Sequence, residues 1–151
     1  AKFSASDWAV LIGAAMEHPN PCVMKTWADR AVAHGQDLNA LMVPPGPSLL
    51  GLVRNTGCLA RVAWVGNHRW ALETLVHAGL RLDLPEPAGD PAWAAPGWTL
   101  DLQIDAELNQ SPWLQRKAQE WQSLLNLSRE RALDAALPAV ESVRPRSGPR
   151  F

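Results

Sequence analysis

The sequence predicts an all-α protein built from stacked antiparallel helix pairs, because one segment of the chain is nearly repeated. Residues 32–39 (VAHGQDLN) and 76–83 (VHAGLRLD) each follow a helix-like run and place a glycine where that helix should end. Each is followed by a proline-rich stretch and a new helix start, at residues 46–49 and 97–100. Two copies of helix, glycine stop, loop and helix start indicate neighbouring units of one stack.

At 151 residues, the chain is expected to form a single helical domain over residues 1–137, followed by a tail over residues 138–151. A hydrophobic content of 47% is typical of a folded protein that needs neither a metal nor a disulfide to hold its core. The formal charge of −1 gives no overall attraction to nucleic acid or to an anionic membrane, so neither is expected as a partner.

The two cysteines, Cys22 and Cys58, lie within apolar runs and are expected to be reduced core thiols of a cytoplasmic protein. No run approaches the ~20 apolar residues that cross a bilayer, and no stretch has the layout of a signal peptide. Tryptophan (eight, against no tyrosine) and arginine (eleven, against three lysines) are overused, which is typical of a GC-rich bacterial source.

The first helix pair is predicted over residues 4–17 and 21–34. The first of these helices carries apolar residues at helical spacing, and a serine at its start, Ser4 or Ser6, can cap it. The Pro-Asn-Pro sequence at 19–21 separates the two helices, because proline cannot continue a helix from within.

The second pair is predicted over residues 48–65 and 68–78. An Asn-Thr-Gly sequence at 55–57 interrupts the first of these helices, and Asn67 is expected to cap the second. The residues before this pair, 36–47, are predicted to form a loop because they end in Pro-Pro-Gly-Pro. The sequence predicts no strand.

Further helices are predicted in the C-terminal third of the chain. Thr99 is expected to cap one that ends near residue 109, and Ser111-Pro112 has the form of a strong helix start. Ser128 is expected to cap a short last helix that ends before Pro138. The helix that Ser111 opens has an apolar stripe at helical spacing, made of Leu114, Ala118, Trp121 and Leu125.

Five short segments along the chain have the form of parts of a repeating unit: a start, a turn between two helices, and a glycine stop. Residues 46–50 (GPSLL) and 97–100 (GWTL) have the form of a repeat start, and Gly66-Asn67 has the form of a turn between two helices. Residues 35–39 (GQDLN) and 79–83 (GLRLD) have the form of a glycine stop followed by an exit loop. In this order the segments resemble the ankyrin repeat.

The resemblance covers about residues 6–125 and implies an ankyrin-like short solenoid with a C-terminal helical extension. The repeating unit is longer than the ankyrin unit of about 33 residues, partly because the loop over residues 84–97 is long and holds four prolines. Ankyrin repeats bind other proteins through their loops. The resemblance therefore implies a non-catalytic protein–protein interaction module, such as a bacterial immunity-type inhibitor or an adaptor.

The residues expected to contact the partner lie in and beside the two loops. Trp93 and Trp98 lie in or just after the proline-rich loop, where nothing in the sequence requires a large aromatic, and tryptophan is enriched in binding hot spots. The alternative is that both fold beneath the loop and fasten it to the helices. With the loop exits, the predicted binding residues are Trp93, Trp98, Asp37, Asn39, Arg81 and Asp83.

Three acidic residues, Asp101, Asp105 and Glu107, indicate an alternative function as a small α-helical enzyme that would use these carboxylates with a histidine. The helix dipole also favours acidic residues near a helix start, which needs no chemistry. His18 and Cys22 have the spacing of metal ligands on a helix, but two prolines intervene, so neither a metal nor a cofactor is expected. A self-associating structural subunit is a third hypothesis, because solenoid ends expose apolar faces.

Overall fold

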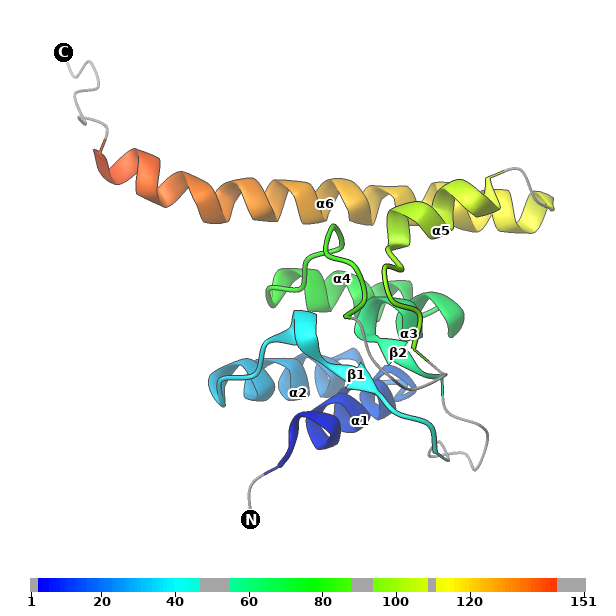
Figure 1. The fold of residues 1–151 in the computed structure, drawn as a ribbon, viewed down its shortest axis with the longest axis horizontal. Coiled ribbons are helices and arrows are strands. Elements are labelled where there is room, and N and C mark those ends of the chain that lie inside the picture. Colours follow the sequence, from blue (N-terminus) through cyan, green and yellow to red (C-terminus); the bar gives the residue numbers. More distant parts are fainter. Residues whose placement is uncertain (1–2, 47–54, 88–93, 109–110, 144–151) are drawn as a thin grey trace.

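A computed structural model describes residues 3–46, 55–87, 94–108 and 111–143, with side chains described as far as residue 136 (Figure 1). Over these ranges the chain is mostly helical, so the all-α prediction is confirmed apart from one very short pair of strands. The helices are α1 (Ala5–Met16), α2 (Pro21–Ala33), α3 (Leu59–Val65), α4 (Arg69–His77), α5 (Leu100–Glu107) and α6 (Pro112–Val143), joined by a 3-10 helix (Leu38–Ala40) and strands β1 (Met42–Val43) and β2 (Gly57–Cys58).

The helices pack in three successive pairs (Figure 1). Within the pairs, α1 packs against α2, α3 against α4, and α5 against α6. Between the pairs, α1 contacts α3, which contacts α5, and α2 contacts α4, which contacts α6. The order of the helices in space therefore follows their order in the sequence. Among the described residues, no helix is long and apolar enough to cross a membrane.

The two strands correct the expectation that residues 36–47 form only a loop. β1 and β2 pair antiparallel, with Met42 opposite Cys58 and Val43 opposite Gly57. Val43 is buried in the core and β1 packs on α1. Each strand is two residues long, which is too short to show the alternation of apolar and polar residues by which a strand is recognised.

Several helix starts follow the prediction closely. The Ser4 hydroxyl accepts a hydrogen bond from the Asp7 backbone N–H (3.1 Å), and the Asp7 carboxylate accepts one from the Ser4 N–H (2.9 Å), which together form a capping box. Thr99 and Ser111 cap α5 and α6 by accepting from the backbone N–H groups three residues further on. Asn67, however, does not cap α4, because it adopts a left-handed conformation (φ +58°) in the turn before it.

The prediction that a helix ends at each of the two repeated glycines is confirmed. Gly35 and Gly79 follow α2 and α4 with φ values of +82° and +118°, in the region that glycine adopts without strain. A side chain at either position would meet no atom within 4 Å. Backbone conformation, and not lack of space, is therefore what favours glycine here.

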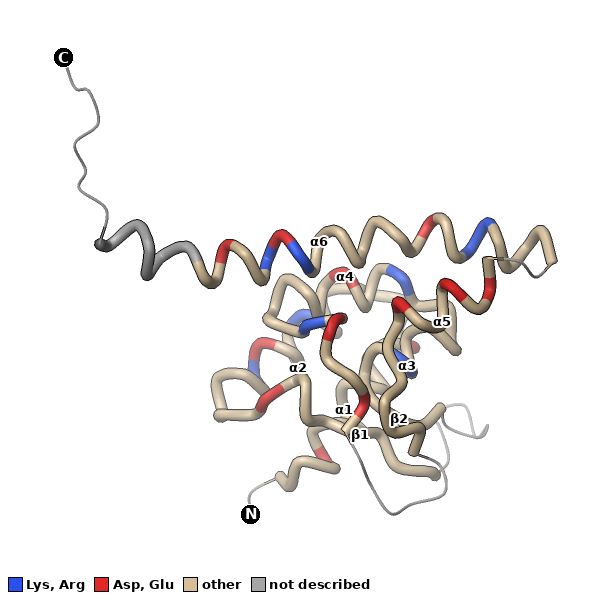
Figure 2. The backbone as a smooth tube through the Cα atoms, turned by 45° about the horizontal axis from the view of Figure 1, so that its top comes forward, with Lys and Arg blue, Asp and Glu red and all other residues tan. Residues whose placement is uncertain are grey.

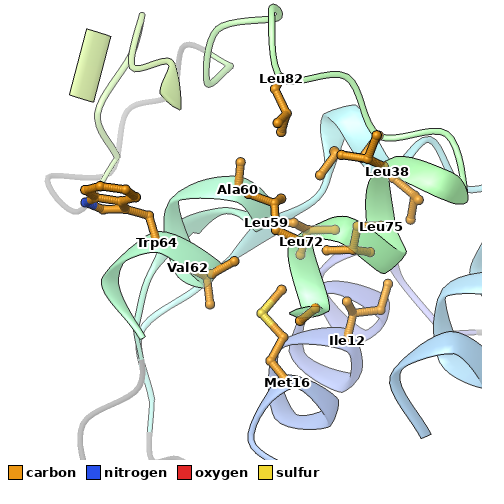
Figure 3. Packing of buried hydrophobic residues seen from close by; sticks show 14 of the residues in the cluster. Ile12, Met16, Leu38, Leu59, Ala60, Val62, Trp64, Leu72, Leu75 and Leu82 are labelled. Carbon is orange, nitrogen blue, oxygen red and sulfur yellow. The ribbon is translucent and has the colours of Figure 1, made fainter. Parts of the chain in front are cut away.

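The core is one cluster of buried residues from all three helix pairs and from the segments after α2 and α4. Figure 3 shows Ile12 and Met16 of α1 facing residues of α3 and α4 across this core. Leu38 and Leu82, from the segments after α2 and α4, cover its upper side in this view. The residues labelled there are all buried: Ile12, Met16, Leu38, Leu59, Ala60, Val62, Trp64, Leu72, Leu75 and Leu82.

The two cysteines are free thiols in different surroundings. Cys22 is exposed, which corrects its expected place in the core: it lies in the first turn of α2, off the buried face of that helix. Cys58 is partly buried in β2, and burial raises the pKa of its thiol to about 12. Burial therefore does not predispose the Cys58 thiol to react as a thiolate.

Helix α6 is continuous over 32 residues, which corrects the expected break at Ser128 and the expected end before Pro138. Ser128 is buried within the helix, and its hydroxyl accepts a hydrogen bond from the Leu82 backbone N–H (2.9 Å). It joins α6 to the segment after α4 and does not cap a helix. Of the predicted stripe, Ala118, Trp121 and Leu125 are buried, and Leu114 is partly buried.

The first half of α6 holds one buried cation. The Lys117 ammonium donates a hydrogen bond to the Trp64 carbonyl (2.6 Å) and lies 4.1 Å from the centre of the Trp64 ring. The rings of Trp64 and Trp121 meet edge to face, with centres 5.0 Å apart and planes at 82°. Burial lowers the pKa of Lys117, while Glu107 acts to raise it. Carbonyl and aromatic contacts thus compensate for much of the lost hydration.

Candidate protein-binding surface

The structure brings together four of the predicted binding residues, which come from two segments more than 40 residues apart. Asp37 precedes the 3-10 helix, and its carboxylate accepts hydrogen bonds from the Asn39 backbone N–H (3.0 Å) and side-chain amide (3.1 Å). The Asn39 side-chain carbonyl then accepts one from the Arg81 backbone N–H (2.8 Å). The segment after α2 therefore holds the segment after α4 in place.

Arg81 and Asp83 form an ion pair on this surface. The Arg81 guanidinium donates two hydrogen bonds to the Asp83 carboxylate, over 3.0 Å and 2.6 Å. These bonds lower the pKa of Asp83 and raise that of Arg81. Both side chains are about half exposed, at 48% and 53%, so the pair contributes little to stability and its polar groups remain accessible. We call Asp37, Asn39, Arg81 and Asp83 the loop-end surface.

Trp98 is placed by contacts of its own. It is partly buried and packs against the core, and its indole N–H donates a hydrogen bond to the Gln103 side-chain carbonyl (3.0 Å). The Gln103 amide donates in turn to the Glu107 carboxylate (2.7 Å). These contacts fasten the end of the proline-rich loop to α5. This is the arrangement expected if Trp98 holds the loop to the helices. Trp93, the other predicted tryptophan, lies outside the described residues.

The residue that organises the base of the proline-rich loop is Glu86, which the sequence reasoning missed. Its side chain is buried (2% exposed for the residue) and accepts hydrogen bonds from the Arg61 guanidinium (2.7 and 3.0 Å), from the Cys58 backbone N–H (2.9 Å) and from the Ala95 N–H. Its own backbone pairs with Gly97 and Trp98. The only signal in the sequence is a single acidic residue between two prolines.

The pKa of Glu86 reflects two opposing effects. Burial raises it, whereas the hydrogen bonds from Arg61, Cys58 and Ala95 lower it, and the net result is a pKa below the ordinary value. The carboxylate therefore stays charged and holds the two ends of the loop together. The same bonds connect the loop to β2 and α3.

A hollow separates the loop-end surface from Trp98 and α5. Its lining includes residues of both regions, Asn39, Arg81 and Leu84 together with Trp98 and Leu100. The enclosed space is about 10 Å³, which is room for about one water molecule. Pockets for small molecules usually measure hundreds of cubic ångströms. This hollow is therefore a small dent, with too little room for such a molecule.

A more open hollow lies along α2, with a volume of about 210 Å³. It is lined by Cys22, Val23, Thr26, Trp27 and Arg30. The Arg30 guanidinium lies over the Trp27 ring, 5.3 Å from its centre. This hollow faces solvent on an exposed part of the helix and contains none of the predicted site residues.

The acidic residues of the enzyme hypothesis do not converge on a cavity. Asp101 and Asp105 are exposed on α5, and Glu107 is engaged by Gln103. Within the part of the chain that the structure describes, no three histidine, cysteine or acidic residues lie close enough to hold a metal ion. The His18 ring accepts a hydrogen bond from the Asn20 N–H (3.0 Å) just before α2.

Comparison of the chain with protein-family models, with curated proteins and with solved structures finds no match. The loop-end surface must therefore be interpreted from its own geometry. It offers exposed polar side chains that are held in position by hydrogen bonds, beside a dent too small for a ligand.

Proposed function

We propose that the chain is a non-catalytic protein–protein interaction module with an ankyrin-like stack of helix pairs. The proposal is supported by the contacts between like helices of successive pairs, α1 with α3 and α2 with α4. It is also supported by the left-handed glycines that end α2 and α4, and by the bond that ties one exit segment to the next. Each of these is a feature expected of repeated units.

The single observation that carries the function is the bond from the Arg81 N–H to the Asn39 side chain. It aligns the segments after α2 and α4, so that Asp37, Arg81 and Asp83 are presented together. A surface ordered before binding loses less entropy when a partner docks, which favours affinity. Within this proposal the partner is a protein, and the role is that of an inhibitor of the immunity type or of an adaptor.

The experiment is to identify a partner by affinity purification and to measure its dissociation constant with variants of the loop-end surface. Arg81→Ala and Asp83→Ala should each weaken binding about tenfold or more, equivalent to about 1.4 kcal/mol. Their melting temperatures should stay unchanged, because an exposed ion pair adds little stability.

Lys25→Ala and Asp29→Ala are the matched controls. These residues form an exposed ion pair of similar length (2.7 Å) on α2, away from the loop ends. Both should retain the affinity of the unmodified protein. Equal affinities for the Arg81, Asp83 and control variants would refute the proposed surface.

A further inference from the structure

The acidic residues are unevenly distributed along the chain. Residues 82–115 contain six aspartates and glutamates and no lysine or arginine, so the rest of the chain holds 14 basic residues against nine acidic ones. Figure 2 shows the consequence: α5 carries acidic residues and no basic one. Because Glu86 is neutralised by Arg61, most of the accessible negative charge that the structure describes in this segment is on α5 and Asp83.

Helix α5 has two distinct faces. Leu100 and Ile104 are buried, and the helix packs through them against the body. Asp101 and Asp105, spaced by four residues, are exposed about 100° around the helix axis from these buried residues, and they take part in none of the ion pairs formed by the described residues. Leu102 lies beside them.

The outer face of α5 is also apolar. Leu102 is 61% exposed and Leu108, one turn beyond Asp105, is 37% exposed. A single exposed leucine needs no explanation, but two leucines interleaved with two unpaired carboxylates form a mixed surface along one short helix. Such a surface binds most favourably to a ligand that supplies both positive charge and an apolar side chain.

We propose that this outer face, made of Asp101, Leu102, Asp105 and Leu108, docks a basic protein segment that carries a large apolar side chain. The inference rests on the proposed function as a protein-binding module and names the chemistry of the partner. Helix α5 begins beside the loop-end surface, because Leu100 at its start lines the same hollow as Arg81 and Leu84. Charge complementarity selects a basic partner and rejects an acidic one.

The arginines of residues 144–151 cannot fill this role at the Glu107 end of α5 within the same molecule. Lys117 lies close enough to Glu107 to interact with it, and Lys117 is 26 helical residues from Val143, which is about 39 Å. Eight extended residues span at most about 28 Å. At that end of α5, a basic segment would therefore have to come from another molecule.

The test uses two synthetic peptides, each titrated into the whole protein at low salt. Arg-Leu-Arg-Arg-Leu-Arg has both the positive charge and the apolar side chains that the proposal requires, and Glu-Leu-Glu-Glu-Leu-Glu is its charge-reversed form. Binding is measured by fluorescence anisotropy and located by amide chemical shifts. The arginine peptide should bind and perturb α5, and rising salt should weaken it, because exposed charges are screened. Equal binding of both peptides would overturn the proposal.

Variants locate the effect on α5. The double substitution Asp101→Asn with Asp105→Asn should weaken the arginine peptide about tenfold, and Leu102→Ser should weaken it severalfold at every salt concentration. The matched control is Glu130→Gln with Asp134→Asn, an exposed acidic pair at the same spacing on α6 beside Leu133, which is 64% exposed. The control should bind as the unmodified protein does. Equal loss in both double variants would overturn the proposal.

Further results distinguish this inference from self-association and from the proposed function. A dimer of the protein that dissociates on removal of residues 144–151 and in the Asp101/Asp105 double variant would overturn it in favour of a second copy as the occupant. If the natural partner is weakened by Arg81→Ala and not by the α5 variants, the inference fails while the proposed function stands. If neither set of variants affects that partner, the proposed function fails as well.

Discussion

Glu86 connects three segments that are separate in sequence. Its carboxylate accepts from Cys58 in β2, from Arg61 in α3 and from Ala95 at the far end of the proline-rich loop. A buried carboxylate is unfavourable unless charge and hydrogen bonds replace its hydration, and four donors do so here. Removal of the charge would weaken the hydrogen bonds that the Arg61 guanidinium donates to this side chain.

Glu86→Gln should therefore lower the free energy of unfolding by about 3 kcal/mol, as expected when one member of a buried ion pair is lost. Denaturant titration measures this change. Glu73→Gln is the control, because Glu73 pairs with Arg69 at 3.3 Å on the exposed side of α4 and should change stability by less than about 0.5 kcal/mol. Similar small changes in both variants would contradict the role of Glu86.

The same carboxylate predicts an acid-sensitive fold. Because the folded state lowers the pKa of Glu86 below its ordinary 4.5, its contribution to stability is complete above that value and is lost as the pH falls through the folded pKa. Denaturant midpoints measured from pH 7 downwards should fall more steeply for the unmodified protein than for Glu86→Gln. Parallel curves for the two proteins would contradict this assignment.

At the scale of the element, helix ends depend on residues close in the chain. Helices α1 and α5 are capped by contacts over three residues, of Ser4 with Asp7 and of Thr99 with Leu102. Helices α2 and α4 are followed by the left-handed glycines Gly35 and Gly79. Such signals can be found by inspection of a few neighbouring positions.

Substitution of the glycines tests their role. Gly35→Ala and Gly79→Ala should each cost roughly 1 kcal/mol, because alanine is strained at positive φ even where space is free. Gly13→Ala is the control: Gly13 lies within α1, and an added Cβ would meet Val43 at an ordinary 3.5 Å. It should be neutral or stabilising by up to about 1 kcal/mol. Calorimetric melting of the three variants would show the opposite signs.

Sequence reasoning failed where a distant contact decides the outcome. Ser128 has the chemistry of a helix cap, but it is buried in α6, where its hydroxyl accepts a hydrogen bond from the N–H of Leu82, 46 residues away. Met42 and Cys58 form a strand pair through a contact across 16 residues. Of the candidate site, the ion pair of Arg81 with Asp83 is local, whereas the Glu86 network depends on partners 9 to 28 residues away. No periodicity in the sequence reports such contacts.

At the scale of the whole molecule, α6 holds the third pair to the second. Arg69 of α4 donates to Ser123 (2.6 Å) and to the Glu120 carbonyl, and Arg131 donates to the His77 carbonyl at the end of α4 (3.0 Å). Beyond this point α6 extends past the body, as Figure 1 shows. Leu133 and the residues after it, as far as side chains are described, are exposed.

Truncation should distinguish the part of α6 that stabilises the fold from the part that extends past it. Removal of residues 133–151 should change the free energy of unfolding by less than about 1 kcal/mol, because the described side chains it removes are exposed. Removal from residue 124 onwards also deletes Leu124, Leu125 and Ser128, which are buried, and should cost at least about 4 kcal/mol. Urea unfolding of the two truncated proteins tests this, and a large loss in the shorter truncation would contradict it.

The edge-to-face contact of Trp64 with Trp121 also gives the molecule an optical reporter. Two indoles with centres 5.0 Å apart have coupled electronic transitions, which produce a paired signal in far-ultraviolet circular dichroism. One ring belongs to α3 and the other to α6, so the signal exists only while these helices are docked. Undocking of the last helix pair should remove this contribution, whereas that of the Trp8–Trp27 pair, whose ring centres lie 6.3 Å apart in the first helix pair, should remain.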